Sequence, residues 1–214
     1  MKYILLILFN MFIGKQIFAQ ELFFHTSKNY SQFLTDNQNA NLVLVPANRS
    51  FSVANSYELG YLWQSASRKT GYSISATYDA YDLNYALNET AFQYQWKLHY
   101  LGIKNAFQWQ LYRSGTNHKG PFSLQGKLGA TLSSFMAGSL ESQGKYLDLY
   151  TGNDFNKFYF QPSAGLQFEY QVIENVKLMG GYQHSTGTVI SNPVKKFSLA
   201  THSLSFGIQF PIKK

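Results

Sequence analysis

The sequence predicts an all-β protein, namely a closed antiparallel transmembrane β-barrel of eight strands in up-and-down meander order. Apolar and polar residues alternate in many segments with the period of two that strands have. Aromatic residues make up 17% of the chain and charged residues only 14%, yet the mean hydropathy is −0.23. Since half of each spanning strand faces a polar interior, such a barrel is rich in aromatic residues without being hydrophobic overall. Long and short connections also alternate along the chain.

The first nineteen residues predict a secretory signal peptide. A short basic start at Lys2 is followed by an apolar run from Ile4 to Ile13, and Ile17-Phe18-Ala19 ends on the small residue that signal peptidase requires. The apolar run has about half of the ~20 residues that a membrane-spanning helix needs, which argues against an N-terminal anchor. We therefore divide the chain into a signal peptide at residues 1–19 and one barrel domain at residues 20–214.

The clearest strand runs from Phe158 to Val172. Every second residue of this segment is apolar or aromatic: Phe158, Phe160, Pro162, Ala164, Leu166, Phe168 and Tyr170. The residues between them are mostly small or polar, and they include Gln161, Gln167 and Glu169. This alternation predicts a strand with one face toward lipid and the other toward the barrel interior, with aromatic residues at both membrane interfaces.

Similar alternation predicts five further strands: Ala54 to Gln64, Gly71 to Tyr81, Phe122 to Ser133, Val176 to His184 and Phe197 to Phe210. The segment Glu21 to Leu34 has a mixed pattern, and we count it as the first strand because the connections then alternate between long and short. The expected connections are Asp36 to Ser52, Ser65 to Thr70, Asp82 to Thr90, Ser114 to Pro121, Ala137 to Lys157, Ile173 to Asn175 and Ser185 to Lys196. Long external loops and short periplasmic turns are typical of outer-membrane barrels.

One segment, Phe92 to Arg113, is ambiguous. Its apolar residues stand at even positions up to Tyr100 and at odd positions from Leu101 onward. The change of phase indicates either a β-bulge at Tyr100 to Gly102 in one long strand or a tight hairpin between two short strands. We favour the single bulged strand, because the segment lacks a good two-residue turn such as Asn-Gly.

Several short motifs carry a resemblance to a known group of proteins: Tyr57-Glu-Leu-Gly-Tyr61, Tyr100-Leu-Gly-Ile103, Gly126-Lys-Leu-Gly-Ala130, Pro162-Ser-Ala-Gly-Leu166 and Leu204-Ser-Phe-Gly-Ile-Gln-Phe210. With these motifs the chain resembles the small eight-stranded outer-membrane β-barrels of the OmpA transmembrane-domain and PorT-like kind. The resemblance implies an integral protein of the Gram-negative outer membrane. Because the pattern is common to barrels of different function, it implies architecture rather than activity. An even number of strands predicts that both termini are periplasmic.

Seven ionisable residues are predicted by parity to face the interior. They are Glu58, Asp79, Lys97, His99, Lys104, Lys127 and Glu169. Since the interior of an eight-stranded barrel is just wide enough for side chains to fill it, we expect a network of ion pairs and hydrogen bonds. The alternative is a narrow path for ions or solutes, which makes a minor pore a second candidate function.

An enzymatic alternative rests on His184, Ser185 and Thr186. Lipid A deacylases, which are also small barrels, carry a His-x-Ser motif near this point of the chain, whereas here Ser185 directly follows His184 and should face the opposite side of the strand. We therefore favour a non-enzymatic protein with His184 at the membrane interface. The chain contains no Cys, its His residues lack metal-site spacing, and we expect no cofactor or metal.

The expected partners are outer-membrane lipid, lipopolysaccharide and other envelope proteins. The segment Gly138 to Phe158 combines Tyr146, Tyr150 and Phe155 with Asp148 and Asp154, a mixture suited to binding a protein, a glycan or lipopolysaccharide. The formal charge of +7 does not indicate nucleic-acid binding, since the basic residues are scattered along the chain. The sequence thus favours a structural, binding or assembly component of the cell envelope.

Overall fold

A computed structural model of the chain describes residues 19–34, 44–46, 53–65, 67–87, 93–115, 120–149, 158–190 and 198–212. The predicted signal peptide lies outside the described residues except for Ala19, at which the first strand begins. Within the described ranges, no helix is long and apolar enough to cross a membrane.

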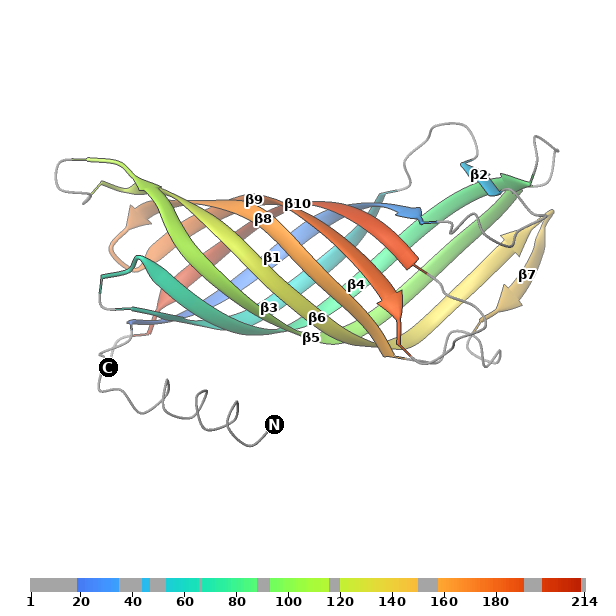
Figure 1. Ribbon diagram of the computed structural model, residues 1–214, viewed down its shortest axis with the longest axis horizontal. Coiled ribbons are helices and arrows are strands. Elements are labelled where there is room, and N and C mark those ends of the chain that lie inside the picture. Colours follow the sequence, from blue (N-terminus) through green and yellow to red (C-terminus); the bar gives the residue numbers. More distant parts are fainter. Residues whose placement is uncertain are drawn as a thin grey trace.

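The described residues form ten strands: β1 (Ala19–Phe33), β2 (Leu44–Pro46), β3 (Val53–Gln64), β4 (Thr70–Leu87), β5 (Gln93–Arg113), β6 (Phe122–Ser142), β7 (Lys145–Asp148), β8 (Phe158–Ile173), β9 (Val176–Val189) and β10 (Ser198–Pro211). Eight of them close into a barrel in the order β4, β3, β1, β10, β9, β8, β6, β5 and back to β4, with every pairing antiparallel (Figure 1). The two short strands are additions, β2 to the edge of β4 and β7 to the edge of β6. The predicted eight-stranded antiparallel barrel is confirmed.

The strands are strongly tilted relative to the barrel axis. A walk across paired residues leaves β1 at Gln20 and returns to β1 at Tyr30, which is 30 − 20 = 10 residues farther along the strand. The residues on this walk are Gln20, Trp63, Tyr72, Phe107, Leu128, Ala164, His184, His202 and Tyr30. A stagger of this size in eight strands corresponds to a tilt of roughly 35–45° and an interior that side chains can fill.

The barrel has two different ends. At one, the turn end, lie the short connections from β3 to β4, β5 to β6 and β8 to β9, together with both ends of the described chain (Figure 1). The amide of Ile212 donates there to the carbonyl of Gln20 at 2.7 Å. At the other, the loop end, β4, β5 and β6 extend past their neighbours, and β2 and β7 pair with their edges. We call the five-stranded extension β2-β4-β5-β6-β7 the loop-end sheet.

The period-two alternation seen in the sequence separates the two faces of the wall. In β8, Leu166 and Phe168 point outward and are 49% and 46% exposed, whereas Gln167 and Glu169 point inward and are 7% and 4% exposed. Apolar side chains therefore cover the outside at mid-barrel and polar side chains fill the inside, which is the arrangement that a barrel crossing a lipid bilayer requires.

Several strands extend farther toward the loop end than expected. Part of the predicted loop Asp82 to Thr90 belongs to β4, which continues to Leu87, and β9 continues to Val189. The predicted loop Ala137 to Lys157 is also partly wrong. In its place β6 runs to Ser142, turns at Gln143 and Gly144 with φ of 52° and 73°, and returns as β7. Beyond the apolar belt the outward positions no longer need to be apolar, so the alternation fades although the strands continue.

The ambiguous segment forms one strand, β5, as favoured. A register shift lies beside the predicted bulge, between His99 and Tyr100, but the extra residue is on the neighbouring strand and not on β5. Tyr100 pairs with Phe135 and His99 with Ala137, so the extra residue is Met136 on β6. Even-numbered residues of β5 face the interior on both sides of this point, from Leu98 and Tyr100 to Gly102 and Lys104. The phase of the apolar residues changes because the interior itself turns from polar to apolar toward the loop end.

Candidate functional site

The barrel interior consists of four layers of side chains. Along β1, from the turn end upward, the inward residues are Glu21, Phe23, His25 and Asn29. They belong in order to a charged layer, a thin apolar layer and a central polar cluster that extends up to Asn29. A larger apolar layer then closes the loop end, where β4 contributes Tyr81 and Leu83. This interior is the candidate site, since most of the predicted ionisable residues lie in it.

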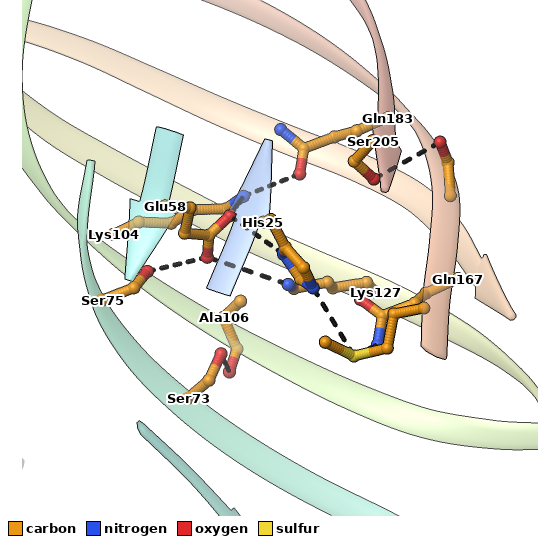
Figure 2. A network of polar contacts seen from close by, with 12 residues as sticks. His25, Glu58, Ser73, Ser75, Lys104, Ala106, Lys127, Gln167, Gln183 and Ser205 are labelled. Atoms are coloured by element: carbon orange, nitrogen blue, oxygen red, sulfur yellow. Dashed lines mark hydrogen bonds and ion pairs between the residues drawn. The ribbon is translucent and has the colours of Figure 1, made fainter. Parts of the chain in front are cut away.

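Glu58 is the centre of the polar cluster (Figure 2). Its Oε2 accepts a hydrogen bond from Nζ of Lys104 at 3.0 Å, and its Oε1 accepts one from Oγ of Ser75 at 2.8 Å. Nζ of Lys127 lies 3.9 Å from Oε1, and Nδ1 of His25 lies 3.7 Å from Oε2. Four strands thus direct one carboxylate, two ammonium groups and an imidazole into a space closed to bulk water, where an unpaired charge would be costly.

The two lysines of the cluster have further partners. Nζ of Lys104 also donates to Oε1 of Gln183 at 2.9 Å, which joins β5 to β9 across the lumen (Figure 2). Nζ of Lys127 lies 5.5 Å from the ring centroid of Phe23, within the range of a cation–π interaction. Both ammonium groups are held by at least two groups, so the cluster is a fixed network rather than a set of mobile charges.

A cavity of about 50 Å³ lies beside the cluster, toward the loop end. Its walls are mainly polar and include Asp79, Gln161, Ser185 and Thr201. A cavity of this size and polarity has room for about three or four water molecules. It is therefore suited to hydrating Asp79 and the lysines, and it is too small for an organic substrate.

A second charged group closes the turn end. Nζ of Lys177 donates to both carboxylate oxygens of Glu21, at 2.8 and 2.9 Å, and lies 3.7 Å from Oε2 of Glu169. Oε1 of Glu169 also accepts a hydrogen bond from Nε2 of Gln167 at 3.2 Å. One cation is thus shared by two buried carboxylates.

Two apolar layers separate the polar ones. Phe23, Leu62 and Met179 form the thin layer between the turn-end charges and the Glu58 cluster. The larger layer, at the loop end, is formed by Tyr81, Leu83, Leu98, Tyr100, Phe135, Leu149, Tyr159, Val189 and Leu199. The rings of Tyr100 and Tyr159 lie 5.1 Å apart at its centre, and both side chains are fully buried. The larger layer interrupts the polar lining of the lumen at the loop end. The thin layer is a cluster of three residues in contact with polar side chains, since Nε2 of Gln167 lies 3.4 Å from Sδ of Met179.

Five of the seven predicted interior residues face the interior: Glu58, Asp79, Lys104, Lys127 and Glu169. The prediction for Lys97 and His99 is wrong. Nδ1 of His99 lies 2.8 Å from the hydroxyl of Tyr78, whose ring stacks on that of Tyr57 on the outer face. Parity misassigned them because the apolar residues beside them, Leu98 and Tyr100, face an apolar interior instead of lipid.

The residues of the enzymatic alternative do not converge. His184 is on the outer face, where its ring centroid lies 4.6 Å from that of His202. Ser185 is inside, 3% exposed, and its Oγ accepts a hydrogen bond from Nε2 of Gln161 at 2.8 Å. Thr186 is exposed on the outer face again. The barrel wall therefore stands between the imidazole and the serine hydroxyl that it would have to activate.

Three members of the two charged groups escaped the sequence analysis: Glu21, His25 and Lys177. Glu21 and His25 lie in the segment of mixed pattern, but their odd positions continue through Phe23 and Asn29 as one inward row. Lys177 begins a row with Met179 and Gly181 that could have placed it inside. Among the described residues, no three His, Cys, Asp or Glu side chains form a group that could hold a metal ion.

Comparison with known proteins identifies the fold. No family model and no curated protein matches the sequence. The structure is similar to that of the outer membrane protein OprG from Pseudomonas aeruginosa, with a TM-score of 0.53 and 12% identity over 92% of this chain and 97% of OprG. Neisserial surface protein A and Escherichia coli outer membrane protein W each give a TM-score of 0.47, at 13% and 11% identity, over 90% and 91% of this chain and 97% and 98% of theirs. The chain thus has the fold of a small outer-membrane β-barrel.

Proposed function

We propose that the protein is an integral outer-membrane protein of a Gram-negative bacterium that neither conducts ions nor catalyses a reaction and acts as a binding or assembly component of the envelope. The observation that carries this proposal is the closed lumen. At the loop end, the apolar layer around Tyr100 and Tyr159 lies across it, and at the turn end the buried ion pairs of Lys177 with Glu21 and Glu169 occupy it. An ion would have to shed its water at this apolar layer, at a cost of many kcal/mol.

The two competing functions have less support. A pore needs a continuous polar path, whereas the charges in this lumen are tied to one another and the cavity beside them is about 50 Å³. A deacylase needs its imidazole and hydroxyl within hydrogen-bond reach of each other, whereas His184 and Ser185 face opposite sides of β9. No cofactor is part of the proposal.

The loop end is the proposed external end, with both termini in the periplasm. Short turns on the periplasmic side and longer connections outside are the usual arrangement in such barrels. The three short connections and both ends of the described chain lie together at the turn end (Figure 1). The loop-end sheet then stands outside the membrane.

The proposed contact surface is the loop-end sheet, which includes the described part of the segment Gly138 to Phe158. In β7, Tyr146 and Leu147 are 66% and 57% exposed, which is unusual for an aromatic and a large aliphatic residue outside the apolar belt. Beside them a shallow groove on β5, β6 and β7 is lined by Lys97 and His99. Aromatic, aliphatic and basic groups in one place suit an envelope protein or the sugar and phosphate groups of lipopolysaccharide.

Site-specific photo-cross-linking in intact cells tests this surface. A photoreactive amino acid replaces Tyr146 in one variant and Leu147 in another, and cross-linked species are identified by mass spectrometry. The proposal predicts one recurrent adduct, with another envelope protein or with lipopolysaccharide, from both positions.

The matched control places the same photoreactive group at Ile173, which is 60% exposed at the turn end. It should not give that adduct. If positions 146 and 147 give no adduct, or the same products as position 173, the loop-end sheet is not a binding surface.

A further inference from the structure

Part of the outer face is polar at a depth where the rest of the barrel is apolar. On β1, β3, β9 and β10, six outward residues form what we call the polar strip: Lys28, Tyr30, Asn55, Tyr182, His184 and His202. Strand pairing makes them neighbours, since Lys28 pairs with Asn55 and with Leu204, and Tyr30 with His202, which pairs in turn with His184.

The polar strip lies within the apolar belt rather than above it. His184 pairs with Ala164 of β8, and β8 carries apolar outward residues beyond that point at Phe160 and Phe158, which are 40% and 59% exposed. On β3, the outward residue beyond Asn55 is Val53, which is 44% exposed. The opposite wall has Leu101, Ile103 and Leu132 at comparable depth. The strip therefore occupies the loop-end half of the belt.

Contacts within the polar strip leave hydrogen-bonding capacity unused. The hydroxyl of Tyr182 lies 2.6 Å from Nδ1 of His202, so with this hydroxyl as donor the neutral His202 ring carries its proton on Nε2. The buried Nδ1 of His184 has no hydrogen-bond partner within the described residues. The exposed Lys28 makes no ion pair or hydrogen bond within the same ranges, in contrast to the interior lysines 104, 127 and 177.

An unpaired ammonium group on the lipid face is unfavourable. Lys or Arg there is costly at the membrane midplane and much less so near the interface, so we expect the long side chain of Lys28 to extend toward the headgroups. The anions at that level of a bilayer are lipid phosphates. A phosphate also accepts hydrogen bonds from imidazole N–H groups, and His202 of the polar strip supplies one.

We propose that the polar strip binds the phosphate of a lipid headgroup in the outer leaflet. Lys28 supplies the charge, and His202, fixed by Tyr182, supplies a second donor. This inference rests on the proposed orientation, with the loop end outside, and it is independent of the binding surface on β7. It assigns one side of the barrel, formed by β1, β9 and β10, to a specific lipid.

Native mass spectrometry of the purified full chain in detergent tests the proposal with two lipids that have the same acyl chains. Dimyristoyl phosphatidic acid carries the phosphate and dimyristoylglycerol lacks it. The wild type should retain phosphatidic acid in preference to diacylglycerol. Lys28→Gln should weaken this retention about tenfold, the loss of about 1.4 kcal/mol expected for one charge-assisted contact. His202→Gln should weaken it several-fold.

Lys69→Gln is the matched control, because it removes the same charge from an exposed position at the turn end, away from both proposed binding surfaces. It should leave retention of the lipid unchanged, and heat-modifiable gel migration should show that all variants are folded. Equal retention of the two lipids by the wild type, or equal effects of Lys28→Gln and Lys69→Gln, would overturn the proposal. So would displacement of the lipid by an equal concentration of inorganic phosphate. The cross-linking at β7 does not depend on this result, so either proposal can fail alone.

Discussion

Lys177 donates to both carboxylate oxygens of Glu21, at 2.8 and 2.9 Å, although the two residues are 156 positions apart in the chain. Glu21 lies on β1 and Lys177 on β9, and β10 lies between these strands in the wall. The pair therefore reaches past β10, the strand that closes the barrel by pairing with β1. Because Glu169 is also only 3.7 Å from Lys177, the two carboxylates depend on one cation.

Lys177→Met should destabilise the barrel more than Glu21→Gln. The lysine variant leaves two buried carboxylates without a cation, whereas the glutamine variant leaves Lys177 with Glu169. Breaking a buried pair costs about 3–5 kcal/mol, and we expect that range for Lys177→Met and a smaller value for Glu21→Gln. Urea unfolding in lipid vesicles, followed by tryptophan fluorescence, measures both. The reverse order would contradict the shared-cation arrangement.

Glu58→Gln should be among the most destabilising single changes in the interior. It leaves Lys104 and Lys127 facing each other without the carboxylate that lies 3.0 and 3.9 Å from them. We expect a loss of about 3–5 kcal/mol in the free energy of unfolding. Asn55→Ala, on the outer face of the same strand, serves as a control and should change it by less than about 1 kcal/mol. Similar losses in the two variants would show that Glu58 does not organise the cluster.

Gly187→Ala should disturb the apolar layer at the loop end. A Cβ at this position would collide with the ring and hydroxyl of Tyr159, which is fully buried. Overpacking of this kind costs about 1–3 kcal/mol. The effect should shrink in a Tyr159→Ala background, since the clashing ring is then gone, and a double-mutant cycle on unfolding free energies measures that coupling. Additive effects would mean that Gly187 is not needed to accommodate Tyr159.

Asn29→Ala should loosen the wall between β3 and β4. The ladder between these strands reaches only to the pair Tyr57 and Tyr78. Beyond it, Nδ2 of Asn29 donates to the carbonyl of Ala80 at 3.3 Å, and the amide of Ala80 donates to Oγ of Ser56. Faster hydrogen exchange is therefore expected around Ala80, together with a loss of about 1–3 kcal/mol for the unsatisfied carbonyl. Unchanged hydrogen exchange around Ala80 would show that the Asn29 side chain does not stabilise the wall beyond the end of the β3–β4 ladder.

The sequence predicted the barrel because lipid outside and a polar interior impose opposite demands on alternate residues. That alternation is regular from Phe158 to Tyr170, and it correctly placed Glu58, Lys104, Lys127 and Glu169 inside. It failed for Lys97 and His99. At their level the interior is apolar, so the apolar residues of the strand face inward and the polar residues face outward. Apolar and polar residues no longer alternate at the end of β6, so the sequence did not predict that this strand continues to Ser142.

The ion pairs could not be predicted from the sequence. Which charges meet depends on the ten-residue stagger of the strands, and each partner comes from a distant segment, as with Glu21 and Lys177. A change of one residue in the register of a strand would turn the side chains of that strand to the other face. The apolar layer around Tyr100 and Tyr159 is equally a product of closure, since its members come from six of the barrel strands and from the stretch after β7.

The central claim is that the lumen is closed, at the loop end by the apolar layer around Tyr100 and Tyr159 and at the turn end by the buried ion pairs of Lys177. Ion conductance tests it most directly. Purified full-length protein is inserted into a planar lipid bilayer, with a porin of known conductance recorded under the same conditions as the control for insertion. We expect a baseline without discrete conductance steps at any applied voltage at which the bilayer itself is stable. Reproducible unitary steps that scale with the amount of inserted protein would contradict the closed lumen and would favour a pore.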